Sequence, residues 1–194
     1  MYELVFKRTI DFVVSVILIV ILSPVLLIVA LLIYRDMGAP IFFTQIRSGK
    51  SKQGFRIYKF RTMRDGAEGD SDKDRITRLG NTLRRWSLDE LPQLFNVVKG
   101  DMSLVGPRPL LPEYDAHYSD EQNKRFLVNP GVTGLAQVEG RNDLQWNEKF
   151  ALDIAYVNSL SALNDIKILV RTVYVVFGAK GFRKSGEEKK FSDL

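Results

Sequence analysis

Two adjacent carboxylates, Asp89 and Glu90, lie among arginines in the stretch RRWSLDELPQLFNVVKGDMSLVGPRP. Arg84 and Arg85 open this stretch, and Arg108 lies near its end between two prolines. A guanidinium can bind phosphate oxygens through two parallel hydrogen bonds, and flanking prolines stiffen the backbone that carries it. Carboxylates repel a phosphate unless a divalent cation lies between them, and Mg²⁺ prefers one or two carboxylates plus substrate phosphates. The pattern therefore predicts Mg²⁺-assisted chemistry on a phosphate ester, with a carboxylate as nucleophile or base.

The same stretch also supports a purely structural interpretation. Ser87 and Glu90 match the S-x-x-E capping box of a helix, and Gly100 is a plausible helix end. The predicted helix rests on apolar residues at helical spacing, namely Leu91, Leu94, Phe95 and Val98. Capping accounts for Ser87 and Glu90, and the helix dipole accounts in part for Asp89. It does not account for the density of cations around the pair.

Further cations stand in two other segments. IFFTQIRSGKSKQGFRIYKFRTM predicts two short strands around a Gly/Ser/Lys turn. Side chains alternate along a strand, so Lys59 and Arg61 are expected to project from one face about 7 Å apart. That spacing suits two oxygens of a diphosphate, although a solvated strand end is the commoner role of such a pair. Arg141 follows Gly140 in the turn-rich stretch NPGVTGLAQVEGRND, on a loop that could approach a ligand.

An uncharged apolar segment of 23 residues, FVVSVILIVILSPVLLIVALLIY, runs from Phe12 to Tyr34. It is long enough to cross a bilayer as a helix, but Pro24 should kink or break it while Ser23 bonds a freed carbonyl. Positive charge on both flanks gives no clear orientation for a spanning helix. Two topologies stay open, a kinked single-pass anchor and a segment that bends at Ser23-Pro24 and leaves on its entry face. Asp11, at the edge, is placed to pair with Lys7 or Arg8.

The composition restricts the class of protein. The 194 residues suit one domain, with or without an appendage, and a net charge of +5 with a pI near 9.4 favours anionic partners. The absence of cysteine excludes a disulfide framework and a thiolate metal site, and His117, the single histidine, excludes a multi-histidine site. Near the end, apolar residues from Ile166 to Phe177 have helical spacing and are accompanied by cations, which predicts a core helix or a helix on a membrane surface.

These motifs, taken in order, resemble the small monotopic phosphoglycosyl transferases of the PglC type, within the bacterial sugar transferases. The resemblance covers nearly the whole chain. Its carriers are the apolar segment with Ser23-Pro24, IYKFRTM at 57–63, SLDELPQLFNVVKGDMSLVGPRP at 87–109 and PGVTGLAQVEGRN at 130–142.

The resemblance implies an α+β fold. We expect a re-entrant membrane helix over residues 1–36, broken at Ser23-Pro24, and a small mixed cytoplasmic catalytic domain over 37–184. That domain should contain short strands and interfacial amphipathic helices, and residues 185–194 should form a flexible tail. The implied location is one leaflet of the bacterial cytoplasmic membrane, with the catalytic domain facing the cytoplasm.

The resemblance also implies an activity. Such enzymes transfer a phospho-sugar from a UDP-sugar to a polyprenol (undecaprenyl) phosphate, release UMP, depend on Mg²⁺, and work by a covalent ping-pong route that initiates glycoconjugate assembly. Asp89 would be the nucleophile and would touch Mg²⁺, and Glu90 would help to deprotonate or position the polyprenol phosphate. The candidates for phosphate contacts are Lys59, Arg61, Arg84, Arg108 and Arg141. The family pattern allows lysine at position 61, which leaves a strict role for Arg61 open.

Two questions remain open at this stage. No residue selects among donors carrying N,N′-diacetylbacillosamine, N-acetylglucosamine-type sugars, galactose or glucose. The basic charge also permits a non-enzymatic, membrane-tethered binder of anionic lipid or nucleic acid, although the enzyme interpretation implies no nucleic-acid partner.

Overall fold

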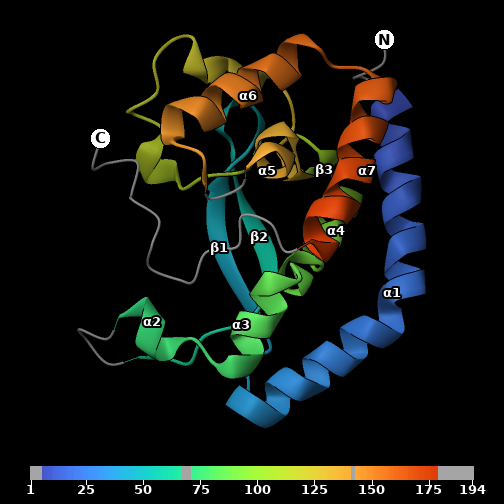
Figure 1. The fold of residues 1–194 in the computed structure, drawn as a ribbon, viewed down its shortest axis with the longest axis vertical. Coiled ribbons are helices and arrows are strands. Elements are labelled where there is room, and N and C mark those ends of the chain that lie inside the picture. Colours follow the sequence, from blue (N-terminus) through green and yellow to red (C-terminus); the bar gives the residue numbers. More distant parts are fainter. Residues whose placement is uncertain (1–5, 67–70, 141–142, 179–194) are drawn as a thin grey trace.

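The computed structural model describes residues 6–66, 71–140 and 143–178. It shows a small domain of mixed helices and strands with one long N-terminal helix along its side (Figure 1), which agrees with the coarse prediction. The helices and strands are, in chain order, α1 (Arg8–Met37), β1 (Phe42–Ser48), β2 (Gly54–Phe60), α2 (Asp72–Arg75), α3 (Arg78–Arg85), α4 (Gln93–Lys99), β3 (Ser103–Val105), β4 (Gly131–Thr133), α5 (Leu135–Glu139), α6 (Trp146–Asn158) and α7 (Ala162–Phe177). Short 3₁₀ helices lie between them at Lys50–Lys52, Leu88–Glu90, Pro112–Tyr114 and Gln122–Leu127.

Helix α1 is apolar and bent. Its most apolar stretch has a mean hydropathy of 3.4 and is only 11% buried, so by length and composition it could cross a membrane. Figure 1 shows that its two halves run in different directions. Pro24 lies inside the helix and has no N–H to donate to the carbonyl of Val20, four residues earlier. The Ser23 hydroxyl donates to that same carbonyl at 2.8 Å, so the predicted repair of the break is confirmed.

The two halves of α1 pack against different parts of the domain. Apolar residues before the bend contact the main core around Val97, Met102 and Ile168; these residues are Val14, Leu18, Ile19 and Leu22. Val29 and Ile33, after the bend, form a second cluster with Phe60 of β2 and Leu83 of α3. The bend therefore lets one helix cover two faces of one domain.

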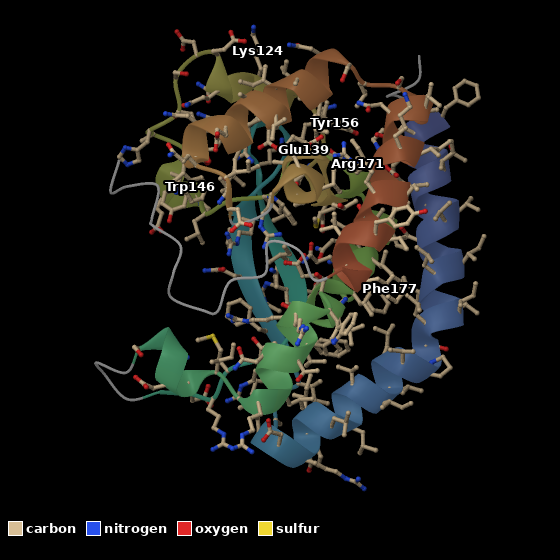
Figure 2. The ribbon with its side chains drawn as sticks, viewed as in Figure 1. Lys124, Glu139, Trp146, Tyr156, Arg171 and Phe177 are labelled. Atoms are coloured by element: carbon tan, nitrogen blue, oxygen red, sulfur yellow. The ribbon has the colours of Figure 1, made fainter. Side chains whose placement is uncertain are left out.

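Both ends of α1 are held by charged contacts with that domain. Lys7, just before the helix, forms ion pairs with Asp11 at 3.6 Å and with Asp165 of α7 at 2.7 Å. The pairing predicted for Asp11 is therefore confirmed with Lys7. We call Lys7, Asp11, Ser103, Tyr156 and Asp165 the anchor cluster, because Ser103 donates to Asp11 and Tyr156 donates to Asp165. Figure 2 marks Tyr156 within the domain.

Two further contacts complete this attachment. Arg8 donates to the carbonyls of Val97 and Val98, in the last turn of α4. Cations stabilise this end of a helix because its last carbonyls lack partners within the helix. At the other end of α1, Asp36 pairs with Arg64 at 3.5 Å.

Strands β1 and β2 form the predicted antiparallel hairpin. Its register places Phe42 opposite Phe60 and Ser48 opposite Gly54. Strand β2 ends at Phe60, so the face that we expected to continue through Arg61 ends at Lys59. The prediction placed the strand end too late.

A second, parallel pair of strands supports the arginine between the prolines. Strands β3 and β4 pair with Ser103 opposite Gly131 and Val105 opposite Thr133. The Gly106 N–H then donates to the Thr133 carbonyl, and the Gly131 N–H donates to the Pro107 carbonyl. A side chain on Gly131 would lie about 2.0 Å from the Gly106 nitrogen, so only glycine allows the two chains to approach this closely.

Helix α7 has one buried and one exposed apolar face. Ile168 lies in the main core, whereas a row of large apolar side chains is exposed, namely Leu163, Ile166, Val170, Val173, Tyr174 and Phe177. Figure 2 shows Phe177 at the end of α7, where its ring packs edge-on against Trp86 with centroids 6.4 Å apart. Arg171 pairs with Glu139 of α5 at 2.6 Å (Figure 2). The core-helix alternative is therefore confirmed for the face that contains Ile168, and a location on the membrane surface stays a prediction for the exposed row.

Candidate active site

The acidic pair lies in the short connection between α3 and α4. Ser87 has φ 54° and ψ 22°, in the left-handed region that non-glycine residues seldom adopt. Asp89 and Glu90 follow in the 3₁₀ turn, and Pro92 stands just before α4, which ends as predicted at Gly100. Ser87 makes no side-chain capping hydrogen bond, so the predicted capping box is wrong. The backbone strain, of order 1–3 kcal/mol, is typical of functional turns.

Glu90 is held by two cations that are distant in the sequence. Lys59 Nζ lies 2.7 Å and Arg108 Nη2 lies 3.0 Å from the same oxygen, Oε1. Burial raises the pKa of Glu90, but attraction to Arg108 and Lys59 outweighs burial and holds this pKa well below its usual range. Glu90 therefore stays ionised and bridges the two cations.

Asp89 differs from its neighbour in almost every respect. It is only 8% exposed, and within the described part of the chain no side chain or backbone N–H pairs with its carboxylate. Burial, followed by repulsion from Glu90, raises the pKa of Asp89 from an ordinary 3.8 to about 6, although Lys59, Arg84 and Arg108 oppose the rise. A carboxylate that is ionised near neutral pH and has no hydrogen-bond partner is well suited to attack an electrophile.

Arg108 extends from a loop whose backbone is firmly held. Its side chain is 48% exposed, while its carbonyl accepts a hydrogen bond from Arg125 Nη2 at 2.6 Å. Arg125 is itself buried and pairs with Asp153 of α6 at 2.9 Å, with Tyr118 beside it. The stiffness inferred from the flanking prolines thus has a second source in Arg125, which sequence reasoning did not single out.

The three other predicted phosphate ligands, Arg84, Arg61 and Arg141, have different positions relative to the acidic pair. Arg84 lies close enough to Asp89 to lower its pKa, and it donates to Thr62 Oγ1 at 3.0 Å. Arg61 instead donates to the carbonyls of Met63 and Ala39, at 2.9 and 3.3 Å, and pairs with Asp65, so the structure does not bring it to the acidic pair. Arg141 lies outside the described residues.

One cation beside the site was missed. Arg47 of β1 interacts electrostatically with both Arg108 and Glu90. Arg47 and Lys59 project from the same face of the hairpin, because side chains alternate along each strand. This shared face can be recognised only when the register of the two strands is known.

The residues around Asp89 fit a magnesium ion that is shared with a ligand. No group of three or more acidic, histidine or cysteine side chains that could hold a metal occurs in the described ranges. Asp89 has a carboxylate without a protein partner, whereas Glu90 is occupied by Lys59 and Arg108. Mg²⁺ often takes only one or two protein carboxylates and completes its coordination with phosphates and water. Asp89 is therefore the residue that would hold it.

A comparison with known families decides the assignment. The model of the family described as "Bacterial sugar transferase" matches residues 2–179. This chain belongs to that family. The resemblance inferred from the sequence motifs is thereby confirmed, and the protein is a sugar-phosphate transferase of the phosphoglycosyl transferase type.

Three relatives illustrate the family. The sugar transferase EpsL of Bacillus subtilis is 41% identical over 186 residues, which cover 94% of this chain and 92% of the relative. The UDP-glucose:undecaprenyl-phosphate glucose-1-phosphate transferase of Caulobacter vibrioides is 42% identical, over 86% of this chain and 68% of the relative. The undecaprenyl-phosphate galactose phosphotransferase of Salmonella typhimurium is 39% identical, over 90% of this chain but only 41% of the relative. This sugar transferase thus spans less than half of some relatives and nearly all of others.

Proposed function

We propose that this protein transfers a phospho-sugar from a UDP-sugar to undecaprenyl phosphate and releases UMP. The names of the Caulobacter and Salmonella relatives support the acceptor and the general reaction. The single observation that carries the proposal is the contrast within the acidic pair. Asp89 is buried with no hydrogen-bond or ion-pair partner, whereas Glu90 is locked between Lys59 and Arg108. Only the first is free to form a covalent bond.

In the first step Asp89 attacks the phosphorus that carries the sugar. A bond forms between the carboxylate oxygen and this phosphorus, and the bond from phosphorus to the bridging oxygen of the diphosphate breaks. The electron pair stays on that oxygen, so UMP leaves with the added negative charge. The phospho-sugar remains on Asp89 as an acyl phosphate.

In the second step an oxygen of undecaprenyl phosphate attacks the same phosphorus. The bond to Asp89 breaks, the carboxylate is regenerated, and the product is a lipid diphosphate that carries the sugar. Two anionic substrates can use one site in turn by this route, and neither has to approach the other directly.

Glu90 supports this chemistry best as a positioning group. A carboxylate whose pKa is held below its usual range is a weak base, so Glu90 is poorly suited to remove a proton from the acceptor. Its bridge instead fixes Lys59 and Arg108 beside Asp89. The two roles predicted for Glu90 were deprotonation and positioning of the polyprenol phosphate. We favour positioning, which Glu90 would exert through Lys59 and Arg108.

Asp89 would hold Mg²⁺ together with phosphate oxygens of the donor. The charge neutralisation that Mg²⁺ supplies when bound lets an anionic carboxylate approach an anionic diphosphate. Protein cations neutralise charge at this site independently of Mg²⁺. Arg108 and Lys59 place their positive charge near the Asp89 carboxylate.

We propose a re-entrant topology with the catalytic domain on the cytoplasmic face, and the attachment of α1 supports the re-entrant part of this proposal. Lys7 at one end and Asp36 at the other both bind the same domain. A straight spanning helix would carry its first residues about 30 Å away, across the hydrocarbon core. A bend at Ser23-Pro24 would keep both ends on one side of the membrane, and the site would then lie where a lipid phosphate can meet a soluble nucleotide. Trp86 and Phe177, which belong to an exposed apolar surface, lie next to the turn that carries Asp89.

Labelling can test this topology, because the chain contains no cysteine. Cysteine is introduced singly as Phe6→Cys, at an exposed position just before α1, and as Asp120→Cys, on an exposed loop. In inside-out membrane vesicles an impermeant maleimide should label both variants. Labelling of Phe6→Cys from the opposite face would establish a spanning helix instead.

The covalent step is tested with Asp89→Asn. Wild-type protein incubated with Mg²⁺ and a panel of UDP-sugars should release UMP and gain the mass of one phospho-sugar on the peptide that contains Asp89. Asp89→Asn should neither release UMP nor gain this mass, yet it should still bind membranes. The control variant Asp120→Asn should behave as wild type in all three measurements. A wild-type protein that forms no adduct with any donor would refute the proposal, and UMP release by Asp89→Asn would remove Asp89 as nucleophile. The same panel identifies the sugar and excludes a non-enzymatic binder.

A further inference from the structure

Arg47 is a cation with too few partners for its surroundings. Its Nη2 donates to Gln45 Oε1 at 2.7 Å, but its Nε is buried without a hydrogen-bond partner among the described residues. No carboxylate in those residues forms an ion pair with it. Burial, followed by repulsion from Arg108, lowers the pKa of Arg47 to about 10. Arg47 as a whole is half-buried, but an N–H group that is buried without an acceptor costs free energy in the free protein.

The position of Arg47 relative to the acidic pair is well defined. Phe43 lies opposite Lys59, and Arg47 lies opposite Phe55, so all four residues belong to one face of the hairpin. Arg47 lies four positions after Phe43 along β1, which corresponds to about 13 Å of strand. Lys59 contacts Glu90 near one end of this face, and Arg47 lies near the other end.

Arg108 connects the two ends of the face. It contacts Glu90 beside Lys59, and it also lies near enough to Arg47 to repel it. The carboxylates Glu90 and Glu113 attract Arg47, but burial and repulsion from Arg108 outweigh this attraction. A bound anion between Arg47 and Arg108 would remove the repulsion and supply an acceptor for Arg47 Nε.

The face also has a direction with respect to the membrane helix. Strand β1 begins at Phe42, five residues after α1 ends at Met37, and Arg47 lies about 17 Å further along the strand. Figure 1 shows β1 extending from the far end of α1 into the domain. Arg47 is thus remote from the end of the hairpin that adjoins the apolar helix, which favours a soluble phosphate over a lipid phosphate.

We propose that Arg47, together with Arg108, binds the donor phosphate that stays with the uridine when the diphosphate is cleaved. This assignment rests on the proposed function, because it takes Asp89 as the nucleophile on the neighbouring phosphorus. UMP gains negative charge as it leaves, and two guanidinium groups at that phosphate stabilise the charge as it develops. Arg47 is therefore a substrate-binding residue, and its Nε gains an acceptor when the nucleotide is bound.

Direct nucleotide binding provides the main test, and it does not require turnover. The affinity of purified full-length protein for UMP is measured by calorimetry for wild type, Arg47→Gln, Arg47→Lys and Arg56→Gln. Arg56 is exposed and projects from the other face of the hairpin, so Arg56→Gln is the matched control. We expect UMP to bind about 10- to 100-fold more weakly to Arg47→Gln, with partial retention in Arg47→Lys. The control should bind as wild type does.

Kinetics and melting curves distinguish the alternatives. The KM for the UDP-sugar should rise in Arg47→Gln while the KM for undecaprenyl phosphate stays unchanged. The melting temperature should not fall, because the substitution breaks no ion pair. A higher KM for the acceptor alone would assign the site to the lipid phosphate and overturn the proposal. Unchanged UMP affinity, or a lower melting temperature that accompanies every loss, would also overturn it.

The two proposals can fail separately. A wild-type protein that forms no adduct refutes the covalent mechanism, whatever Arg47 does. If that protein still binds UMP and Arg47→Gln weakens the binding, the nucleotide site stands alone. Normal UMP affinity in Arg47→Gln, alongside an active wild type, refutes only the role of Arg47.

Discussion

The anchor cluster and the acidic pair both bring carboxylates and cations together below the surface, and they are built in opposite ways. In the anchor cluster Lys7 lies between Asp11 and Asp165, and each carboxylate also accepts a hydrogen bond from a hydroxyl group. At the acidic pair both Lys59 and Arg108 form ion pairs with Glu90. Asp89 has no hydrogen-bond or ion-pair partner among the described residues. The backbone differs as well, because Ser87 near the acidic pair adopts a left-handed conformation.

The two clusters illustrate two roles of buried charged groups, stabilisation of the fold and binding of a ligand. A buried ion that is fully paired contributes to holding elements in place, and loss of one partner is costly. A buried ion without a partner costs stability in the resting protein and becomes satisfied only when a ligand arrives. The first arrangement ties α1 to α7, and the second prepares a site for chemistry. Three substitutions test this distinction, in order of decreasing effect.

Removal of the central cation should damage the anchor cluster most. Lys7→Met leaves Asp11 and Asp165 buried without their shared cation, so we expect a loss of about 3–5 kcal/mol in the free energy of unfolding. Chemical denaturation in nanodiscs measures it, and the exposed Lys167→Met serves as control. Asp165→Asn should cost less, because Lys7 keeps Asp11 as a partner. Equal losses for Lys7→Met and Lys167→Met would contradict the structural role.

Substitution of Glu90 should alter the chemistry rather than the fold. Glu90→Gln releases Lys59 and Arg108 from their shared acceptor, and we expect kcat to fall about 100-fold. It also removes repulsion from Asp89, so the pKa of Asp89 should fall and the acid limb of the pH–rate profile should move to lower pH. An acid limb that stays in place would show that Glu90 does not set the ionisation of Asp89.

Removal of the Asp89 charge should stabilise the protein, in contrast to Lys7→Met. The folded-state pKa of Asp89 is raised from 3.8 to about 6, so stability is lost as pH rises through this interval. Asp89→Asn removes the loss, and we expect a gain of about 2 kcal/mol at pH 8 that shrinks at pH 5 and vanishes below pH 4. Denaturation at these three pH values measures it. A variant less stable than wild type at pH 8 would mean that Asp89 is paired after all.

Local sequence patterns predicted the features that depend on neighbouring residues. The hairpin, the bend at Pro24 with its Ser23 hydrogen bond, and the end of α4 at Gly100 all follow from chemistry within a few positions. The capping box failed because Lys59 and Arg108, 31 and 18 residues away, compete for the Glu90 carboxylate. A charged partner at 2.7 Å outweighs a capping bond, and local spacing contains no information about it.

The candidate site was predictable in part for the same reason. Asp89, Glu90 and Arg108 stand out because unusual residues are concentrated in one stretch of sequence. Arg61 matched the predicted alternation of cations along the strand, but it lies just beyond the end of β2. Its guanidinium donates to the backbone carbonyls of Met63 and Ala39 instead. Arg47 and Arg125 reach the site only through the register of the hairpin and the packing of α6, which the sequence does not display.

The division of α1 between two apolar clusters has a consequence for how the protein can be made. Val97 and Ile168 are covered on one side by the first half of the helix, and Phe60 and Leu83 by the second half. Deletion of α1 would thus uncover hydrophobic residues in both places, and we expect the remaining fragment to aggregate. The apolar helix completes the hydrophobic core of this protein and is not a detachable appendage.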